Sequence, residues 1–118
     1  MTPARTPLRA GDVIRVDFGV PRGSATAFAR AAVIVTATEV LAQRPRTLQV
    51  VPITGNVRRR MRTELLLSGR YPDRASAAQT HLITTIPTAA IIEKVYEPVE
   101  ATELAQIREL LADQLDIP

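Results

Sequence analysis

The stretch that most constrains the fold runs from Gly11 to Val35 and has the pattern of a strand, a loop and a second strand. Side chains over residues 13–18 alternate between two sets, which is the period of a half-buried strand. Residues 19–29 interrupt this alternation with Gly, Pro, Arg and Ser, which favour turns. The apolar run over residues 31–35 is short enough to be a buried strand. Arg30 stands where the loop and this strand meet, so we expect the strand to anchor a charged side chain that faces whatever the loop covers.

Short strands and one final helix account for the rest of the chain. A short helix is predicted over residues 36–44, with Thr38 as its N-cap and Pro45 ending it. Further strands are predicted over residues 47–53, 63–67, 75–86 and 91–99. From Glu100 onward the apolar residues recur with helical spacing, at Leu104, Ile107, Leu111 and Leu115. This order predicts a mainly β, α+β fold: a small barrel with a C-terminal helix, or another α+β sandwich.

Length and composition indicate one domain. A chain of 118 residues can bury one modest core, and we expect a flexible N-terminal tail over residues 1–10 followed by a single domain over residues 11–118. One His and no Cys argue against a structural zinc site. No apolar run approaches the roughly 18 residues of a membrane span, and residues 1–10 lack the apolar core of a signal peptide. We therefore expect a cytoplasmic protein with no metal and no cofactor.

The charge is distributed unevenly along the chain. Residues 1–74 carry 13 basic and 5 acidic side chains, a net charge of +8, whereas residues 75–118 carry 2 basic and 7 acidic ones, a net charge of −5. A basic first half favours an anionic partner. Because 14 of the 15 basic residues are Arg, a compositional bias toward Arg is an equally good explanation.

Three blocks of sequence resemble one family. The first is GDVIRVDF at residues 11–18, followed by Arg-Gly-Ser at residues 22–24 and by Arg30 before an apolar strand. The second is VPITGN at residues 51–56, and the third begins with Asp-Arg-Ala-Ser at residues 73–76. Together they resemble the MazF/PemK-type toxins, small endoribonucleases of bacterial toxin–antitoxin pairs. The resemblance covers most of the chain and implies a small SH3-like, CcdB-PemK-like barrel.

The resemblance also implies a catalytic pair. In the family, an Arg at the start of the second strand acts with a Thr at the end of a V-P-apolar-T strand, which here are Arg30 and Thr54. They would flank a scissile phosphate, where a guanidinium offers forked donors and a hydroxyl adds a neutral one. The alternative is that Arg30 is a surface charge and Thr54 an ordinary turn residue.

The third block departs from the family pattern at several positions. His81 stands at a position that is acidic in the family, Leu82 at a Gln position and Thr84 at a basic one. The first block also departs from the family pattern, because Ala31 stands where the family usually has Pro. His81 has the only side chain with an ordinary pKa near neutral pH. It could supply the acid or the base when a 2′-OH of RNA attacks phosphorus, or it could be a strand histidine held by a neighbour.

Further residues are candidates for binding RNA. The dense basic run at residues 58–62 could hold the phosphate backbone in a salt-sensitive way without reading sequence, or it could be a solvated loop. Phe28, in the loop before Arg30, could stack on a base or be covered by an antitoxin. The RNA-binding candidates are Ser24, Phe28, Asn56, Arg58, Arg59, Arg60 and Arg62.

These patterns predict a toxin that cuts single-stranded RNA at a short sequence, without metal, through a 2′,3′-cyclic phosphate, as the resemblance implies. Its expected partners are a second copy of the chain, in a homodimer, and a cognate acidic antitoxin. One alternative is a DNA gyrase poison of the CcdB type, but such proteins act through a C-terminal helix ending in Trp-Gly-aliphatic, and this chain has no Trp. Another alternative is a catalytically impaired toxin-like protein that only binds its antitoxin.

Overall fold

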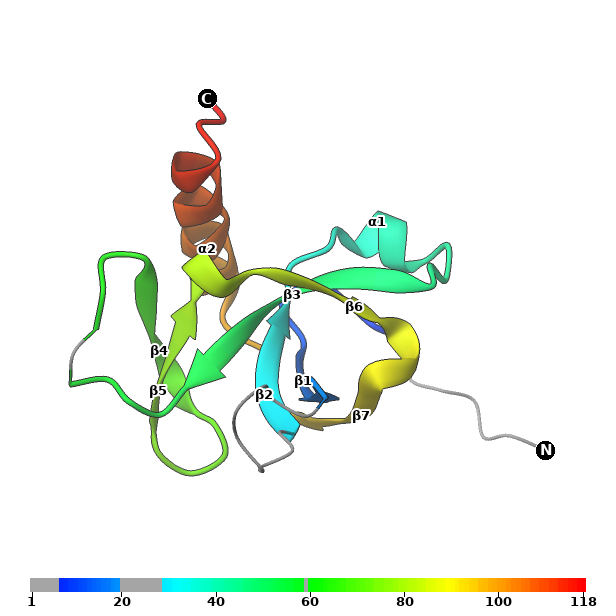
Figure 1. Cartoon of the computed structure of the whole chain (residues 1–118), viewed down its shortest axis with the longest axis horizontal. Helices are drawn as coiled ribbons and strands as arrows, with labels where there is room; N and C mark the ends of the chain where they lie inside the picture. The colour runs from blue at the N-terminus through cyan, green and yellow to red at the C-terminus, as the bar shows by residue number, and fades with distance from the viewer. Residues whose placement is uncertain (1–6, 20–28, 59) are drawn as a thin grey trace.

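The computed structural model describes residues 7–19, 29–58 and 60–118, and within them the fold is a seven-stranded sheet with one long C-terminal helix (Figure 1). The strands are β1 (Val13–Asp17), β2 (Ala29–Ile34), β3 (Thr47–Thr54), β4 (Glu64–Arg70), β5 (Ala75–Gln79), β6 (Thr84–Pro87) and β7 (Ile91–Tyr96). The helices are α1 (Thr38–Leu41) and α2 (Ala101–Gln114), and two 3₁₀ turns are η1 (Thr80–Leu82) and η2 (Thr88–Ala90). The predicted mainly β fold with a C-terminal helix is confirmed.

The sheet has the strand order β4-β5-β3-β2-β1-β7, with β6 also paired to β3. Neighbouring strands are antiparallel, and alternate side chains therefore point to opposite faces. On one face Val13, Val33 and Val51 form a buried cluster with Ile107 and Leu111 of α2. The helix thus covers one face of the sheet and buries its apolar stripe there (Figure 1).

The opposite face encloses a second buried cluster. Ile14 from β1, Ala32 and Ile34 from β2, and Leu48 and Val50 from β3 lie together in it. Strands β7, β1, β2, β3 and β6 curl around this cluster and form the barrel part of the fold (Figure 1). Alternate residues of β1, β2 and β3 therefore point into two different hydrophobic clusters.

Helix α2 starts where the sequence predicted and ends earlier. Glu103 is buried and its carboxylate accepts a hydrogen bond from the Glu100 N–H at 3.0 Å, which satisfies a backbone donor at the helix start. The same carboxylate accepts bonds from the Ser68 N–H at 2.7 Å and the Ser68 hydroxyl at 3.3 Å. The expectation that Leu115 belongs to the apolar helix face was wrong, because the helix ends at Gln114 and Leu115 is 58% exposed.

The single strand predicted over residues 75–86 was also wrong, because two strands occupy this segment with η1 between them. Ile53 of β3 lies opposite Ala78, and Val50 lies opposite Thr84. A distance of three residues along β3 is therefore matched by six residues along the segment from β5 to β6, and the three extra residues form η1. Thr80 holds this turn, because its N–H and its hydroxyl both donate to the carbonyl oxygen of Thr63.

Other predicted boundaries shift by a few residues. The helix expected over residues 36–44 spans only α1, and its N-cap is Ala37 rather than Thr38. Strand β4 continues through residues 68–70, past its expected end at residue 67, with an irregular pairing to β5. Strand β7 ends at Tyr96 rather than at residue 99.

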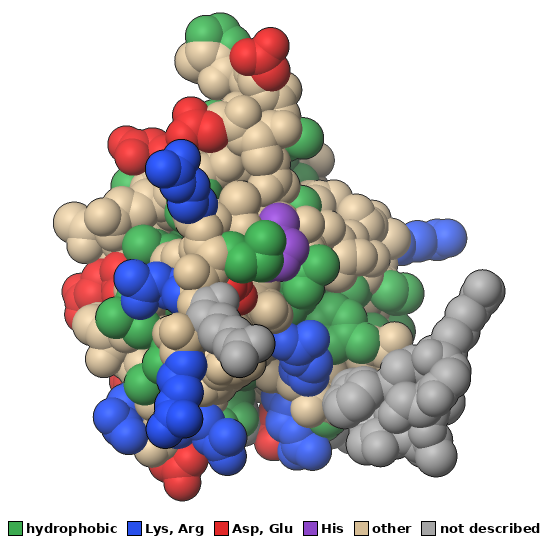
Figure 2. Space-filling view, turned by 60° about the vertical axis from the view of Figure 1, so that its left-hand side comes forward, with side chains coloured by type: hydrophobic (Ala, Val, Ile, Leu, Met, Phe, Trp, Pro, Cys, Tyr) green, Lys and Arg blue, Asp and Glu red, His purple; other side chains and the backbone are tan. Residues whose placement is uncertain are grey.

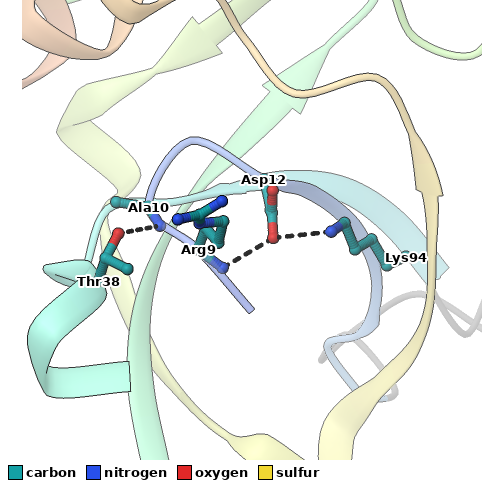
Figure 3. Close-up of polar contacts among 5 residues, drawn as sticks. All are labelled: Arg9, Ala10, Asp12, Thr38 and Lys94. Atoms are coloured by element: carbon teal, nitrogen blue, oxygen red, sulfur yellow. Dashed lines mark hydrogen bonds and ion pairs between the residues drawn. The ribbon is translucent and has the colours of Figure 1, made fainter. Parts of the chain in front are cut away.

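Residues 9–12 are tethered to the barrel (Figure 3). Asp12 is 4% exposed and accepts a hydrogen bond from the Arg9 N–H at 2.8 Å, while its carboxylate lies 3.2 Å from Lys94 Nζ on β7. The Thr38 hydroxyl accepts a bond from the Ala10 N–H at 3.1 Å, so its role is to hold this segment rather than to cap α1. Residues 1–6 of the expected tail lie outside the described residues. None of the described helices is long and apolar enough to cross a membrane.

Candidate active site

Arg30 lies near the start of β2, on the same side of the strand as Ala32 and Ile34. Its guanidinium is partly buried, and Nη2 donates one hydrogen bond to the Ile53 carbonyl oxygen at 3.2 Å and another to Gln79 Oε1 at 2.8 Å. Desolvation by burial lowers the pKa of Arg30 from its ordinary value, but a guanidinium stays protonated at neutral pH. The site therefore contains a fixed positive charge in a partly dehydrated position.

Thr54 is the last residue of β3 and directly follows Ile53, whose carbonyl holds Arg30. The β2–β3 register pairs Ala32 with Pro52, and the same register continued by two residues would align Arg30 with Thr54 on one face. Thr54 Oγ1 accepts a hydrogen bond from the Asn56 N–H at 3.1 Å. This bond fixes the hydroxyl oxygen in the turn and leaves its own proton to donate elsewhere.

Arg74 covers the turn that follows Thr54. A Cβ built on Gly55 would lie 2.5 Å from Cδ of Arg74, so the Arg74 stem passes directly over the glycine. Arg74 belongs to the third block of sequence that resembles the family, but no role was predicted for it. The sequence feature that could have identified Arg74 is its position directly after the acidic residue of the third block. The turn at residues 54–56 brings it next to Thr54.

Two further residues that sequence analysis missed form a hydrogen-bonded series with Arg30. The Gln79 amide accepts from Arg30 through Oε1 and donates through Nε2 to Glu64 Oε2 at 3.2 Å. Glu64 is 9% exposed, and its Oε1 accepts from the Met61 N–H at 2.7 Å. Gln79 and Glu64 are direct partners in the β5–β4 register. The only sequence signal for them was a carboxylate and an amide within otherwise apolar strands.

His81 is less closely connected to the site. It lies in η1 rather than in the predicted strand, and its Nδ1 is 2.8 Å from the Thr63 hydroxyl oxygen. Among the hydrogen bonds of the described residues, none joins His81 to Arg30 or to Thr54. The interpretation of His81 as a histidine held by a neighbour agrees with this contact, and its catalytic role stays a prediction.

The loop between β3 and β4 is a basic surface. Arg58, Arg60 and Arg62 are exposed there, and Asn56 is exposed at its start. Figure 2 shows that most Lys and Arg side chains on this face gather in its lower half, below the histidine. Three other RNA-binding candidates, Ser24, Phe28 and Arg59, lie outside the described residues. Over residues 7–19, 29–58 and 60–118, no three acidic or His side chains gather in a way that could hold a metal ion.

A comparison with protein families finds one match over nearly the whole chain. Residues 9–115 match the model of the "PemK-like, MazF-like toxin of type II toxin-antitoxin system". No curated protein sequence is significantly similar to this chain.

Solved structures with the same fold include several MazF proteins. A MazE–MazF structure from Deinococcus radiodurans has a TM-score of 0.80 at 15% identity, covering 97% of this chain and 100% of that one. An endoribonuclease in complex with its cognate antitoxin, from a mycobacterial species, has a TM-score of 0.71 at 20% identity, covering 94% and 97%. The toxin MazF-mt6 from Mycobacterium tuberculosis has a TM-score of 0.65 at 20% identity, covering 91% and 98%. At these identities the likeness establishes the fold.

Proposed function

The chain belongs to the PemK-like, MazF-like toxin family of type II toxin–antitoxin systems, and from this premise we propose that it is an endoribonuclease that cuts single-stranded RNA. The observation that carries the proposal is the state of Arg30. Its guanidinium is partly buried and is held through Nη2 by the Ile53 carbonyl and Gln79, and the β2–β3 register continued by two residues would align Arg30 with Thr54. Such a preorganised cation suits the charge that develops on a phosphate during transfer.

The proposed reaction is attack by the RNA 2′-OH on the adjacent phosphorus. A bond forms between the 2′-oxygen and phosphorus, the bond from phosphorus to the 5′-oxygen breaks, and the products are a 2′,3′-cyclic phosphate and a 5′-OH. Negative charge gathers on the non-bridging oxygens, where Arg30 and the Thr54 hydroxyl stabilise the transition state more than the bound substrate. No step requires a metal ion or a cofactor.

Two protons move in this reaction. A base takes the proton of the 2′-OH, and an acid gives one to the leaving 5′-oxygen. Arg30 cannot serve as the base because its guanidinium keeps its protons. His81, the single imidazole in the chain, is the candidate for one of these transfers, with Nδ1 engaged by Thr63 and Nε2 as the atom that would exchange the proton.

The remaining basic residues would hold the RNA chain. Arg58, Arg60 and Arg62 are exposed on the loop that leads from Thr54 to β4, and phosphate contacts by Arg supply affinity that falls with salt. Arg74 lies over Gly55 and adds a further guanidinium beside the cleavage site. Leu82 and Thr84 differ from the residues usual in the family at these positions, and we therefore expect this protein to recognise a different RNA sequence from other members.

The proposed partners follow from the family and from charge. Two of the structural neighbours are toxin–antitoxin complexes, one from Deinococcus radiodurans and one mycobacterial. For this chain we infer a cytoplasmic homodimer whose basic face is bound by an acidic segment of an antitoxin. That segment would be disordered when free and would fold on binding.

The proposal is tested by incubating the purified protein with a long labelled RNA in the presence of a chelator. We expect the RNA to be cut, with new ends that can be mapped by sequencing and that carry a 2′,3′-cyclic phosphate. A parallel assay with DNA gyrase tests the alternative function, and gyrase inhibition without RNA cleavage would refute the nuclease. A protein that cuts no RNA but binds its antitoxin would support the impaired-toxin alternative. Arg46→Ala, which changes an exposed Arg before β3, is the control for loss of general positive charge.

A further inference from the structure

The proposed reaction uses Arg30 and Thr54 but gives no role to the two residues behind Arg30. Gln79 and Glu64 connect the guanidinium to the backbone of the β3–β4 loop through three consecutive bonds, at 2.8, 3.2 and 2.7 Å. Glu64 is almost fully buried. A carboxylate of this kind normally has a cation or several donors beside it, and here its partners are an amide group and a backbone N–H.

The donor-to-acceptor direction of these three hydrogen bonds is determined at both ends. Arg30 can only donate, so the Gln79 oxygen must face it, and the Gln79 NH₂ group must then face Glu64. Glu64 uses one oxygen for Gln79 and the other for Met61. Only a carboxylate has two acceptor oxygens at this position, because an amide has one acceptor and one donor group. The Gln79 side chain is therefore held in one orientation.

The choice of an amide next to Arg30 matters for a site that binds phosphate. A carboxylate in direct contact with the guanidinium would neutralise its charge and compete with an anionic substrate. With Gln79 between them, the charge of Glu64 is kept one residue away while its hydrogen bond still orients the amide. The result is a guanidinium that is positioned and still electrostatically available.

From this geometry we propose that Gln79 is a positioning residue for Arg30 and that Glu64 fixes Gln79 and the β3–β4 loop at the same time. This inference rests on the proposed nuclease function of Arg30. Because Met61 lies within the basic loop, the orientation of Arg30 is coupled to the segment that carries Arg60 and Arg62.

Kinetics on one oligonucleotide provide the first test. Gln79→Leu removes both hydrogen bonds and should lower kcat by about ten- to a hundredfold with KM nearly unchanged, because misplacement of a catalytic group acts on the chemical step. Gln79→Glu should instead raise KM, because its carboxylate pairs with Arg30 in place of the phosphate. Glu64→Gln should lower kcat, and combining it with Gln79→Leu should add no further loss. Gln106→Leu, on the exposed side of α2, is the matched control and should behave as wild type.

A second measurement requires no RNA. Hydrogen bonds to Ile53 and Gln79 should slow rotation of the Arg30 guanidinium, giving separate ¹⁵N signals for its two Nη atoms, assigned by their loss in Arg30→Ala. Gln79→Leu should merge these signals. If Gln79→Leu does not fold, as judged by thermal unfolding, Gln79→Ala replaces it in both tests.

The outcomes separate the two proposals. If the wild-type protein cuts no RNA, the nuclease function fails while the guanidinium signals still decide whether Gln79 holds Arg30. If wild type cuts RNA and the folded Gln79 variant keeps kcat within twofold, the positioning role is overturned. A rise in KM alone in Gln79→Leu also overturns it, because Gln79 would then contact RNA directly.

Discussion

Replacing Arg30 with Lys should separate the charge of this residue from its shape. The guanidinium makes both of its bonds to Ile53 and Gln79 through Nη2, so its other nitrogens can face a phosphate. A Lys ammonium is a single nitrogen, and two bonds to the same acceptors would leave it one proton for the substrate. We expect kcat to fall by about a hundred- to a thousandfold, or about 2.7–4 kcal/mol of activation free energy, as for removal of one oxyanion donor.

The stability of the protein should change far less than its activity. Arg30→Ala deprives the Ile53 carbonyl and Gln79 of a donor, at about 1 kcal/mol per bond, but it also removes a charge whose lowered pKa reflects unfavourable desolvation. Initial rates on one oligonucleotide, beside thermal unfolding curves and the Arg46→Ala control, provide the assay. A folded Arg30→Ala protein with near-normal turnover would refute the assignment of the active site.

Four further predictions concern other parts of the molecule. Thr54→Ala should lower kcat clearly while Thr54→Ser keeps most of it, since Ser retains the hydroxyl that the Asn56 N–H holds; initial rates decide this. Changing Arg60 and Arg62 together to Ala should raise KM, nearly preserve kcat and flatten the salt dependence of RNA binding in titrations from low to high salt. Asp12→Ala should lower the free energy of unfolding in urea by about 1–3 kcal/mol, because the Arg9 N–H and Lys94 lose a buried acceptor; an unchanged midpoint would contradict this. Burial, and after it the charge of Glu103, raise the pKa of Tyr71 above its ordinary value of 10.0. The stability that the neutral Tyr71 side chain contributes is therefore fully present below pH 10 and is lost as pH rises through the raised pKa. Tyr71→Phe should weaken this alkaline loss of stability, as measured by unfolding curves at high pH.

The strands of the barrel could be predicted because their burial follows a local pattern. Alternation at Ile14 and Val16 and the apolar run through Val33 and Ile34 depend only on neighbouring residues, and both segments are strands with those side chains buried. The helical spacing of Ile107 and Leu111 likewise predicted α2. In each case the buried positions follow from the order of apolar residues within one element, and a single sequence records that order directly.

The missed features depend on contacts between distant residues. The break between β5 and β6 is held by Thr80 bonding to Thr63, and β-forming residues on both sides concealed it. The pairing of Gln79 with Glu64 is a matter of strand register, which alternation does not specify between two strands. Arg30 and Thr54 were named through the family resemblance, and their catalytic roles stay predictions. Arg74 lies in the third block that resembles the family, but only the turn of the chain at Gly55 brings it to the site.

The buried carboxylate of Glu103 has a consequence for how the molecule opens. It accepts hydrogen bonds both from the Glu100 N–H at the start of α2 and from Ser68 on β4, which lies 35 positions before Glu103 in the chain. If α2 detached alone, the Ser68 N–H would lose its acceptor, and if β4 detached alone, the Glu103 carboxylate would keep only one of its three hydrogen bonds. Each partial opening is therefore more costly than its own apolar contacts suggest, and the helix and the strand should exchange their amide hydrogens as one cooperative unit.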